Sequence, residues 1–151
     1  MVSAISVGNS ILKRAFAEDI DITPMKLQKL TYIVYKEYLK KTDTPLFSER
    51  FEVWQYGPVL RSIYDAFKHK KANAIKTYAL GADGAVYVVN EDTSIVFGQI
   101  LDYVWGKYKH YDGLILSQMT HRNGTAWHKA VLARKPFLTD DEIRTEEDFN
   151  K

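Results

Sequence analysis

The chain has 151 residues, of which 46% are hydrophobic and 26% are charged, and its formal net charge at pH 7 is +2. These values are typical of a soluble globular protein, so we expect one domain over residues 1–151. The charge is far below that of a dedicated nucleic-acid binder, and the lack of cysteine excludes disulfides and cysteine-ligated zinc. No apolar run reaches the roughly 20 residues that a membrane helix needs. Charged residues interrupt residues 1–21, where a signal peptide would lie. We therefore expect a cytoplasmic protein.

Two helices are predicted in the first part of the chain. Residues 3–18 form the first, and the second begins at Pro24, because Thr23 is a good N-cap and proline suits a first helical turn. The second helix has one apolar side at helical spacing, made of Leu27, Leu30, Thr31, Val34, Tyr35 and Tyr38. Four lysines gather on its opposite side: Lys26, Lys29, Lys36 and Lys40. We expect this lysine face to be exposed to solvent.

The middle of the chain contains the predicted β structure. The segment FEVWQY, residues 51–56, alternates in the manner of a short strand. Gly57 then permits a sharp turn, and Pro58 suits the first turn of a helix that continues over residues 59–67. Residues 77–90 are predicted to form a small hairpin whose turn lies at residues 81–84.

The remaining sequence is predicted to be helical. Helices are expected over residues 91–108, 112–121 and 127–133, the last of them capped by Thr125. Thr139 and Glu142 have the spacing of a capping box before a final helix. The prediction is a mainly α (α+β) fold: a compact bundle of six or seven helices with one small antiparallel β element.

The sequence contains few catalytic or metal-binding patterns. The four histidines lack metal-ligand spacing, and neither a phosphate-binding loop nor a nucleophile elbow is present. Thr120, His121 and Asp112 form a conceivable nucleophile, base and orienting acid, but only geometry can support such a triplet. We favour the simpler reading that Thr120 and His121 bond to the backbone near a helix end. We predict a protein that is not an enzyme and has no cofactor or metal.

Two kinds of binding remain open. The lysine face and the basic residues 69–71 are the features that favour a nucleic-acid-binding regulator, although the low net charge argues against it. Four large aromatic residues lie near the ends of predicted elements: Trp54, Tyr56, Trp105 and Trp127. Core packing is the reading we favour for each of these residues, and contact with a partner protein is the alternative.

Three blocks of the sequence together resemble the Panacea domain, the family of SocA-like antitoxins and phage-element proteins. The blocks are ITPMKLQKLTYIVYKEYL at 22–39, PLFSERFEVWQYGPVLRSIYDAFK at 45–68 and LILSQMTHRNGTAWHKA at 114–130. The second contains the aromatic-x-Tyr-Gly-Pro core, and the third contains a Leu-Ser…Thr-His…Trp pattern. One departure is Ala126, where the family commonly has proline directly before the tryptophan.

The resemblance implies a mostly helical domain of antitoxins that neutralise toxins by direct protein contact. We therefore expect a cognate toxin protein as the partner, with a nucleic-acid-binding regulator or a non-catalytic phage or mobile-element accessory protein as the alternative. The sequence does not indicate the oligomeric state or the identity of the toxin. The candidate contact or motif residues are Lys26, Lys29, Lys36, Trp54, Tyr56, Gly57, Pro58, Thr120, His121 and Trp127.

Overall fold

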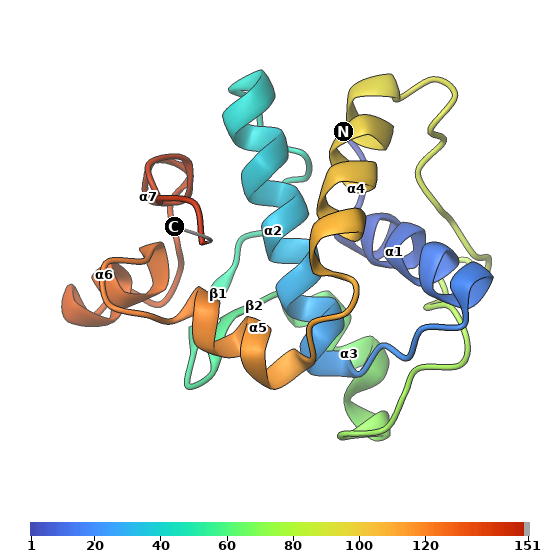
Figure 1. Cartoon of the computed structure of the whole chain (residues 1–151), viewed down its shortest axis with the longest axis horizontal. Helices are drawn as coiled ribbons and strands as arrows, with labels where there is room; N and C mark the ends of the chain where they lie inside the picture. Colours follow the sequence, from blue (N-terminus) through green and yellow to red (C-terminus); the bar gives the residue numbers. More distant parts are fainter. Residues whose placement is uncertain (150–151) are drawn as a thin grey trace.

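The computed structural model describes residues 1–149, which form seven α-helices, one 3-10 helix and one two-stranded antiparallel sheet (Figure 1). The elements in chain order are α1 (Ala4–Glu18), α2 (Pro24–Thr42), β1 (Glu52–Trp54), β2 (Gly57–Val59), α3 (Arg61–Phe67), η1 (Lys68–Lys70), α4 (Ile95–Tyr108), α5 (Gly113–Thr120), α6 (Ala126–Leu132) and α7 (Asp140–Arg144). The predicted mainly α fold with one small antiparallel sheet is confirmed. No described helix is both long enough and apolar enough to span a membrane.

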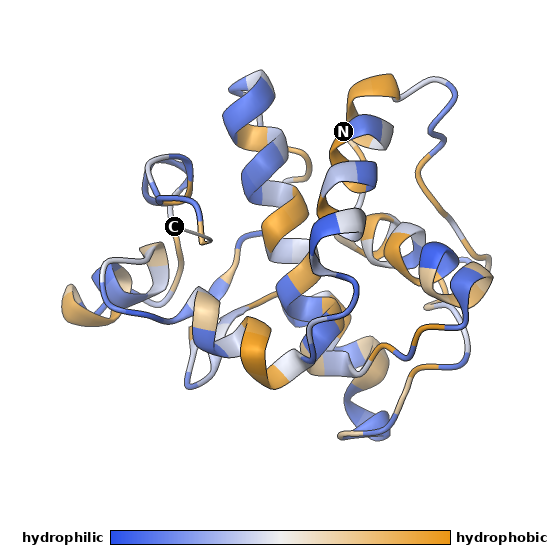
Figure 2. Ribbon diagram, viewed as in Figure 1, coloured by the Kyte–Doolittle hydropathy of each residue, from blue (hydrophilic) through white to orange (hydrophobic). Residues whose placement is uncertain are grey.

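Helix α2 lies at the centre of the fold (Figure 1). It packs against five other helices, α1, α3, α4, α5 and α7, and against strand β2. Every residue from Lys26 to Lys36 is buried, although hydrophilic residues recur along the helix (Figure 2). The helix begins as predicted, because the Thr23 hydroxyl accepts a hydrogen bond from the backbone N–H of Lys26 at 3.3 Å.

The aromatic part of the core fastens the chain after α2 back onto that helix. The Tyr32 ring lies edge-on to the Phe51 ring with centroids 5.1 Å apart, and the Tyr35 and Phe47 ring centroids are 4.7 Å apart. Such pairs add about 0.5–1.5 kcal/mol each beyond the apolar area that they bury. These contacts place residues 47–51, and therefore the start of β1, against α2.

The expectation that the lysine face of α2 is exposed is wrong for three of its four members. Lys26, Lys29 and Lys36 are 6%, 2% and 1% exposed, and Lys40 alone is open to solvent. Each buried amine donates a hydrogen bond to a backbone carbonyl: Lys26 to Lys109, Lys29 to Pro58 at 2.8 Å and Lys36 to Glu147 at 2.7 Å. The three acceptors belong to the end of α4, to β2 and to the segment after α7. Segments remote in sequence therefore cover the side of α2 that helical periodicity assigned to solvent.

The segment after α7 is held by one buried carboxylate, that of Glu146. Its oxygens accept hydrogen bonds from the Tyr32 hydroxyl at 2.9 Å and the backbone N–H of Ala126 at 2.8 Å, and Lys36 Nζ lies 3.0 Å away. Burial lowers the pKa of Lys36, and the charge of Glu146 opposes that shift. The amine also lies 3.7 Å from the centroid of the Phe149 ring. This cluster joins α2, α6 and the end of the described chain.

The predicted hairpin over residues 77–90 is wrong, since the structure assigns no strand to those residues. The turn itself is present, with the N–H of Gly81 bonded to the carbonyl of Ala85 at 2.7 Å. Two side chains of α1 make the backbone bonds that a second strand would have supplied. The Asn9 amide bonds to both backbone groups of Ala79 at 2.9 Å, and the Ser10 hydroxyl accepts the N–H of Val89 at 2.9 Å. The segment is therefore extended but fastened to a helix.

Replacing Glu146 by alanine is predicted to destabilise the fold by about 3–5 kcal/mol, because it leaves the Lys36 ammonium buried without a counter-charge. Urea unfolding followed by circular dichroism measures this loss. The matched control is Glu147→Ala, which removes an exposed side chain but keeps the carbonyl that Lys36 uses; it is expected to change stability by less than about 0.5 kcal/mol. A loss below about 1 kcal/mol for Glu146→Ala would contradict the structural role given to this carboxylate.

Candidate functional site

The central feature of the site is the tight turn between β1 and β2. The strands pair with Trp54 opposite Gly57, so Gln55 and Tyr56 form the loop. Gly57 has φ = +113°, a conformation that other residues rarely adopt. A Cβ atom at Gly57 would also lie 2.9 Å from Thr120 Oγ1 and 3.3 Å from Lys29 Nζ. Glycine is therefore required here both by backbone conformation and by close packing.

Pro58 does not begin a helix, so that prediction is wrong. It lies in β2 opposite Val53, and helix α3 begins three residues later, at Arg61. A proline fits this small sheet because its position requires no N–H donor, and its carbonyl accepts the hydrogen bond from Lys29. Helix α2 also binds the backbone of Leu60, just after β2. The Gln28 side chain accepts a hydrogen bond from the Leu60 N–H at 2.9 Å and donates one to the Leu60 carbonyl at 3.0 Å.

Residues of the third sequence block, on α5 and α6, bind the turn from the side opposite α2. The Ser117 hydroxyl on α5 donates to the Tyr56 carbonyl at 2.7 Å, and the Trp127 indole N–H on α6 donates to the Trp54 carbonyl at 2.6 Å. Thr120 is fully buried, and its hydroxyl donates to the Ser117 carbonyl at 3.0 Å. Residues from all three blocks thus meet at one turn, which the sequence order alone does not reveal.

The conceivable catalytic triplet is not assembled. Asp112 is the N-cap of α5 and accepts the Ile115 N–H at 2.8 Å, whereas Thr120 and His121 lie at the other end of that helix, about 12 Å away by helical rise. The His121 ring packs edge-on against Trp127, with centroids 5.3 Å apart. The expected backbone bond is found for Thr120, whereas His121 Nδ1 lies 3.4 Å from the side-chain hydroxyl of Ser117. Among residues 1–149 there is no group of three or more histidine, aspartate and glutamate side chains placed to hold a metal ion.

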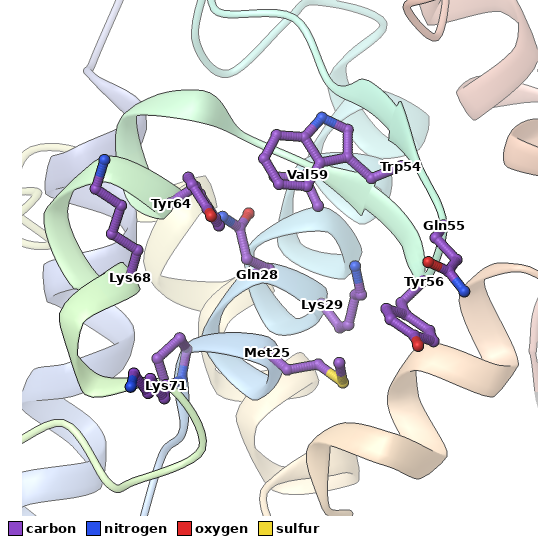
Figure 3. A pocket seen from close by; sticks show the side chains of 11 residues that line it. Met25, Gln28, Lys29, Trp54, Gln55, Tyr56, Val59, Tyr64, Lys68 and Lys71 are labelled. Carbon is purple, nitrogen blue, oxygen red and sulfur yellow. The ribbon is translucent and has the colours of Figure 1, made fainter.

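A pocket of about 430 Å³ opens beside the turn, between α2 and the segment of α3 and η1 (Figure 3). Its lining residues are Pro24, Met25, Gln28, Lys29, Trp54, Gln55, Tyr56, Val59, Tyr64, Lys68 and Lys71. Figure 3 shows Lys29 in the middle of this group, with Trp54 and Val59 to one side and Met25 and Tyr56 to the other. The pocket therefore has mostly apolar and aromatic walls around one buried amine.

Three of the candidate residues, Lys29, Trp54 and Tyr56, line this pocket. Gly57, Pro58, Thr120 and Trp127 support the turn behind it. Lys26 and Lys36 bind other segments of the chain, and His121 packs on Trp127. The sequence did not single out Met25, Gln28, Tyr64 or Lys68 as site residues, and it indicated Lys71 only as part of the basic residues 69–71. No local pattern assigns these residues to one site, because they come together only when α3 and η1 pack beside α2.

Trp54 is held rigidly at the pocket. Its ring lies edge-on to Tyr64 with centroids 4.7 Å apart, and the Arg61 guanidinium stacks over it at 4.8 Å. The indole N–H donates to Glu52 at 3.0 Å, and Glu52 also binds Arg61 at 3.0 Å. The hydrogen bond from Arg61 lowers the pKa of Glu52, which keeps this carboxylate charged. A fixed aromatic wall of this kind loses little entropy when a partner packs against it.

Lys29 is the unusual ionisable group of the site. Burial lowers the pKa of its amine from 10.5 to about 7. A neutral amine can still donate to the Pro58 carbonyl, so deprotonation preserves the hydrogen bond while removing the buried charge. In the unfolded chain the same amine holds its proton up to about pH 10.

The fold is consequently predicted to become more stable as pH rises from 7 to 9, because the unfolded state then binds more protons than the native state. Relative to a Lys29→Met variant, the wild-type free energy of unfolding should rise by about 2 kcal/mol over this interval. Urea unfolding of both proteins at several pH values measures their free energies of unfolding. Subtracting the value for Lys29→Met removes the contribution of the other titrating groups. Lys40→Met, at an exposed lysine of the same helix, should show no such trend. A wild-type-minus-Lys29→Met difference that stays constant with pH would contradict a buried amine.

Comparisons with known proteins agree with the three sequence blocks. The model of the family described as "Antitoxin SocA-like, Panacea domain" matches residues 27–128, which include the turn, Trp127 and most of the pocket lining. Antitoxin SocA of Caulobacter vibrioides (strain NA1000 / CB15N) is 34% identical over 89 residues, which is 59% of this chain. The aligned part spans 40% of that relative's length. No solved structure matches the chain. The family match covers more than half of the chain, which therefore belongs to the SocA-like Panacea domain family.

Proposed function

We propose that this protein is an antitoxin that neutralises a cognate toxin by direct binding. Membership of the SocA-like family and the similarity to antitoxin SocA support the role. We assign the binding surface to the β1–β2 turn and its pocket, because residues of all three motif blocks meet there. The residues that the family pattern emphasises hold this turn in one shape, and a shape held so firmly is suited to recognition by a partner.

The pocket has the properties of an anchor site in a protein interface. Such sites are pockets with aromatic and aliphatic walls, surrounded by polar groups that exclude water when the partner binds. Here Tyr56 is 53% exposed although it lies beside the buried residues Gly57 and Pro58. Because the carbonyl of Tyr56 is bound by Ser117, its ring is presented from a fixed backbone. The toxin is proposed to cover the pocket and the exposed Tyr56 ring beside it.

The alternative of a nucleic-acid-binding regulator loses its main motivation. It was based on the lysine face of α2, and three of the four lysines in that face are buried and bonded to backbone carbonyls. Their buried amines do not form the exposed basic stripe that would follow a phosphate backbone, whose contacts supply most of the affinity in nucleic-acid binding. Direct protein contact is therefore the function that the site supports best.

The test is co-expression with the product of the neighbouring gene, followed by growth measurements and size-exclusion chromatography. Wild-type protein is expected to restore growth and to elute in a complex. Tyr56→Ser should weaken the complex about tenfold or more, since exposed aromatic anchors dominate interface energies. The matched control is Tyr103→Ser, at a tyrosine of α4 that is 50% exposed and lies outside the pocket. No growth rescue together with no complex would count against the antitoxin role.

A further inference from the structure

The three buried lysines of α2 differ in how their charges are compensated. Lys36 has the Glu146 carboxylate 3.0 Å from its amine. Lys26 is attracted by the charges of Asp112 and Asp21, which oppose the lowering of its pKa by burial. For Lys29 the structure records one hydrogen bond, to the Pro58 carbonyl, and burial is the sole cause of its lowered pKa. Within residues 1–149, Lys29 is therefore the buried lysine of α2 that no carboxylate compensates.

The position of Lys29 matters because its side chain lines the pocket. An ammonium group carries three N–H donors, and the Pro58 carbonyl accepts one of them. An isolated charge held in an apolar site is costly unless it is paired. The chain places other charged groups at this pocket, but they are also lysines, Lys68 and Lys71, and none of the lining residues is acidic. The pocket thus combines apolar walls with a positive charge that has no counter-charge in its lining.

We propose that the pocket receives an acidic side chain of the toxin together with an adjoining aromatic or aliphatic residue. The carboxylate pairs with the Lys29 ammonium, and the apolar residue packs among Met25, Val59 and the aromatic rings of Trp54 and Tyr56. This inference rests on the proposed binding of a toxin and adds the chemistry by which the toxin is recognised.

Charge complementarity is the reason for choosing an acidic segment over a purely apolar one. An apolar side chain alone would fill the walls, but it would remove the Lys29 amine further from water, which disfavours the protonated form and supplies no acceptor for the remaining N–H donors. A carboxylate in the same place supplies a charge-assisted hydrogen bond, which is roughly twice as strong as a neutral one. Lys68 and Lys71 at the same pocket favour the approach of a negative segment and increase its association rate.

The volume and accessibility of the pocket fit part of a protein chain. A space of about 430 Å³ is at the lower end of the range for small-molecule sites and accommodates one large side chain with an acidic neighbour. Tyr56, Tyr64, Lys68 and Lys71 are exposed around it, so a bound segment can continue beyond the pocket onto the surrounding surface. A protein partner needs such open surface, because its chain must enter and leave the pocket.

The first experiment uses short peptides as probes and does not depend on knowing the toxin. Acetyl-Phe-Glu-amide and acetyl-Phe-Gln-amide differ only in the charge of the second side chain. Each peptide is titrated into ¹⁵N-labelled protein. The backbone amide signals of Lys29, Trp54 and Tyr56 and the indole N–H signal of Trp54 are followed by NMR. The glutamate peptide is expected to bind about tenfold more tightly than the glutamine peptide, as a charge-assisted hydrogen bond predicts. Equal affinities, no response at millimolar peptide, or responses confined to other surfaces would each overturn the proposal.

Variants then connect the preference to one amine. Lys29→Met keeps the length and the apolar stem of the side chain and should abolish the preference for the glutamate peptide. Lys40→Met, at an exposed lysine of the same helix outside the pocket, should keep it. Thermal unfolding and the dispersion of the NMR spectrum confirm that each variant is folded. If Lys29→Met does not fold, Tyr56→Ser serves instead, and it should weaken both peptides. A Lys29→Met variant that retains the preference, or a Tyr56→Ser variant that binds both peptides as the wild type does, would contradict the proposed contacts.

Co-expression separates this proposal from the antitoxin role itself. If wild-type and Lys29→Met proteins both rescue growth and bind the toxin equally well, the antitoxin role stands and the acidic anchor is refuted. If wild-type protein neither rescues growth nor binds the neighbouring gene product, the antitoxin role fails, while the peptide titration still tests the pocket. Rescue by the wild type with at least about tenfold weaker toxin binding by Lys29→Met is the result expected when both proposals hold.

Discussion

Hydrogen bonds from three buried lysine amines of α2 to backbone carbonyls hold this fold together. Each bond connects the central helix to a segment remote in sequence: the end of α4, strand β2, and the chain after α7. Burying an amine is unfavourable unless its donors are satisfied, and carbonyls at element ends are acceptors that themselves need partners. Each amine here pairs one of its N–H donors with one such carbonyl. For Lys26 the acceptor is the carbonyl that follows α4, where the partial negative charge of the helix end favours a cation.

The site follows from the same constraint. Lys29 binds the carbonyl of Pro58, and the Lys29 amine also lies so close to Gly57 that a Cβ atom there would contact it. Ser117 and Trp127 then fix the carbonyls of Tyr56 and Trp54 from the opposite side. The family motif is thus largely a description of how one tight turn is held between α2, α5 and α6. Its functional consequence is the pocket, whose walls are the side chains that this turn presents.

Local capping signals in the sequence placed three of the helix starts, although the starts predicted at Pro58 and at residue 91 were wrong. Thr23 before Pro24, Thr125 before α6 and the pair Thr139–Glu142 all mark helix starts correctly, because a cap acts on residues within one turn. The lysines of α2 could not be placed in this way. Their burial depends on acceptors 29 to 111 residues away in the chain, and helical periodicity contains no information about such partners. The same reason explains why the hairpin predicted over residues 77–90 is absent: side chains of Asn9 and Ser10 on α1 bond to the backbone of this segment instead.

The motif residues were recognised from the sequence, but their division into two groups was not. Gly57, Pro58, Thr120 and Trp127 hold the turn, whereas Lys29, Trp54 and Tyr56 face the pocket, and this distinction depends on which side of the turn each residue occupies. The most direct test of the account is NMR detection of lysine ammonium protons at about pH 5.5. Three ammonium groups, those of Lys26, Lys29 and Lys36, are expected to exchange with water far more slowly than that of exposed Lys40. Exchange of all lysine ammonium protons at the rate of solvent-exposed groups would contradict the central role given to these buried amines.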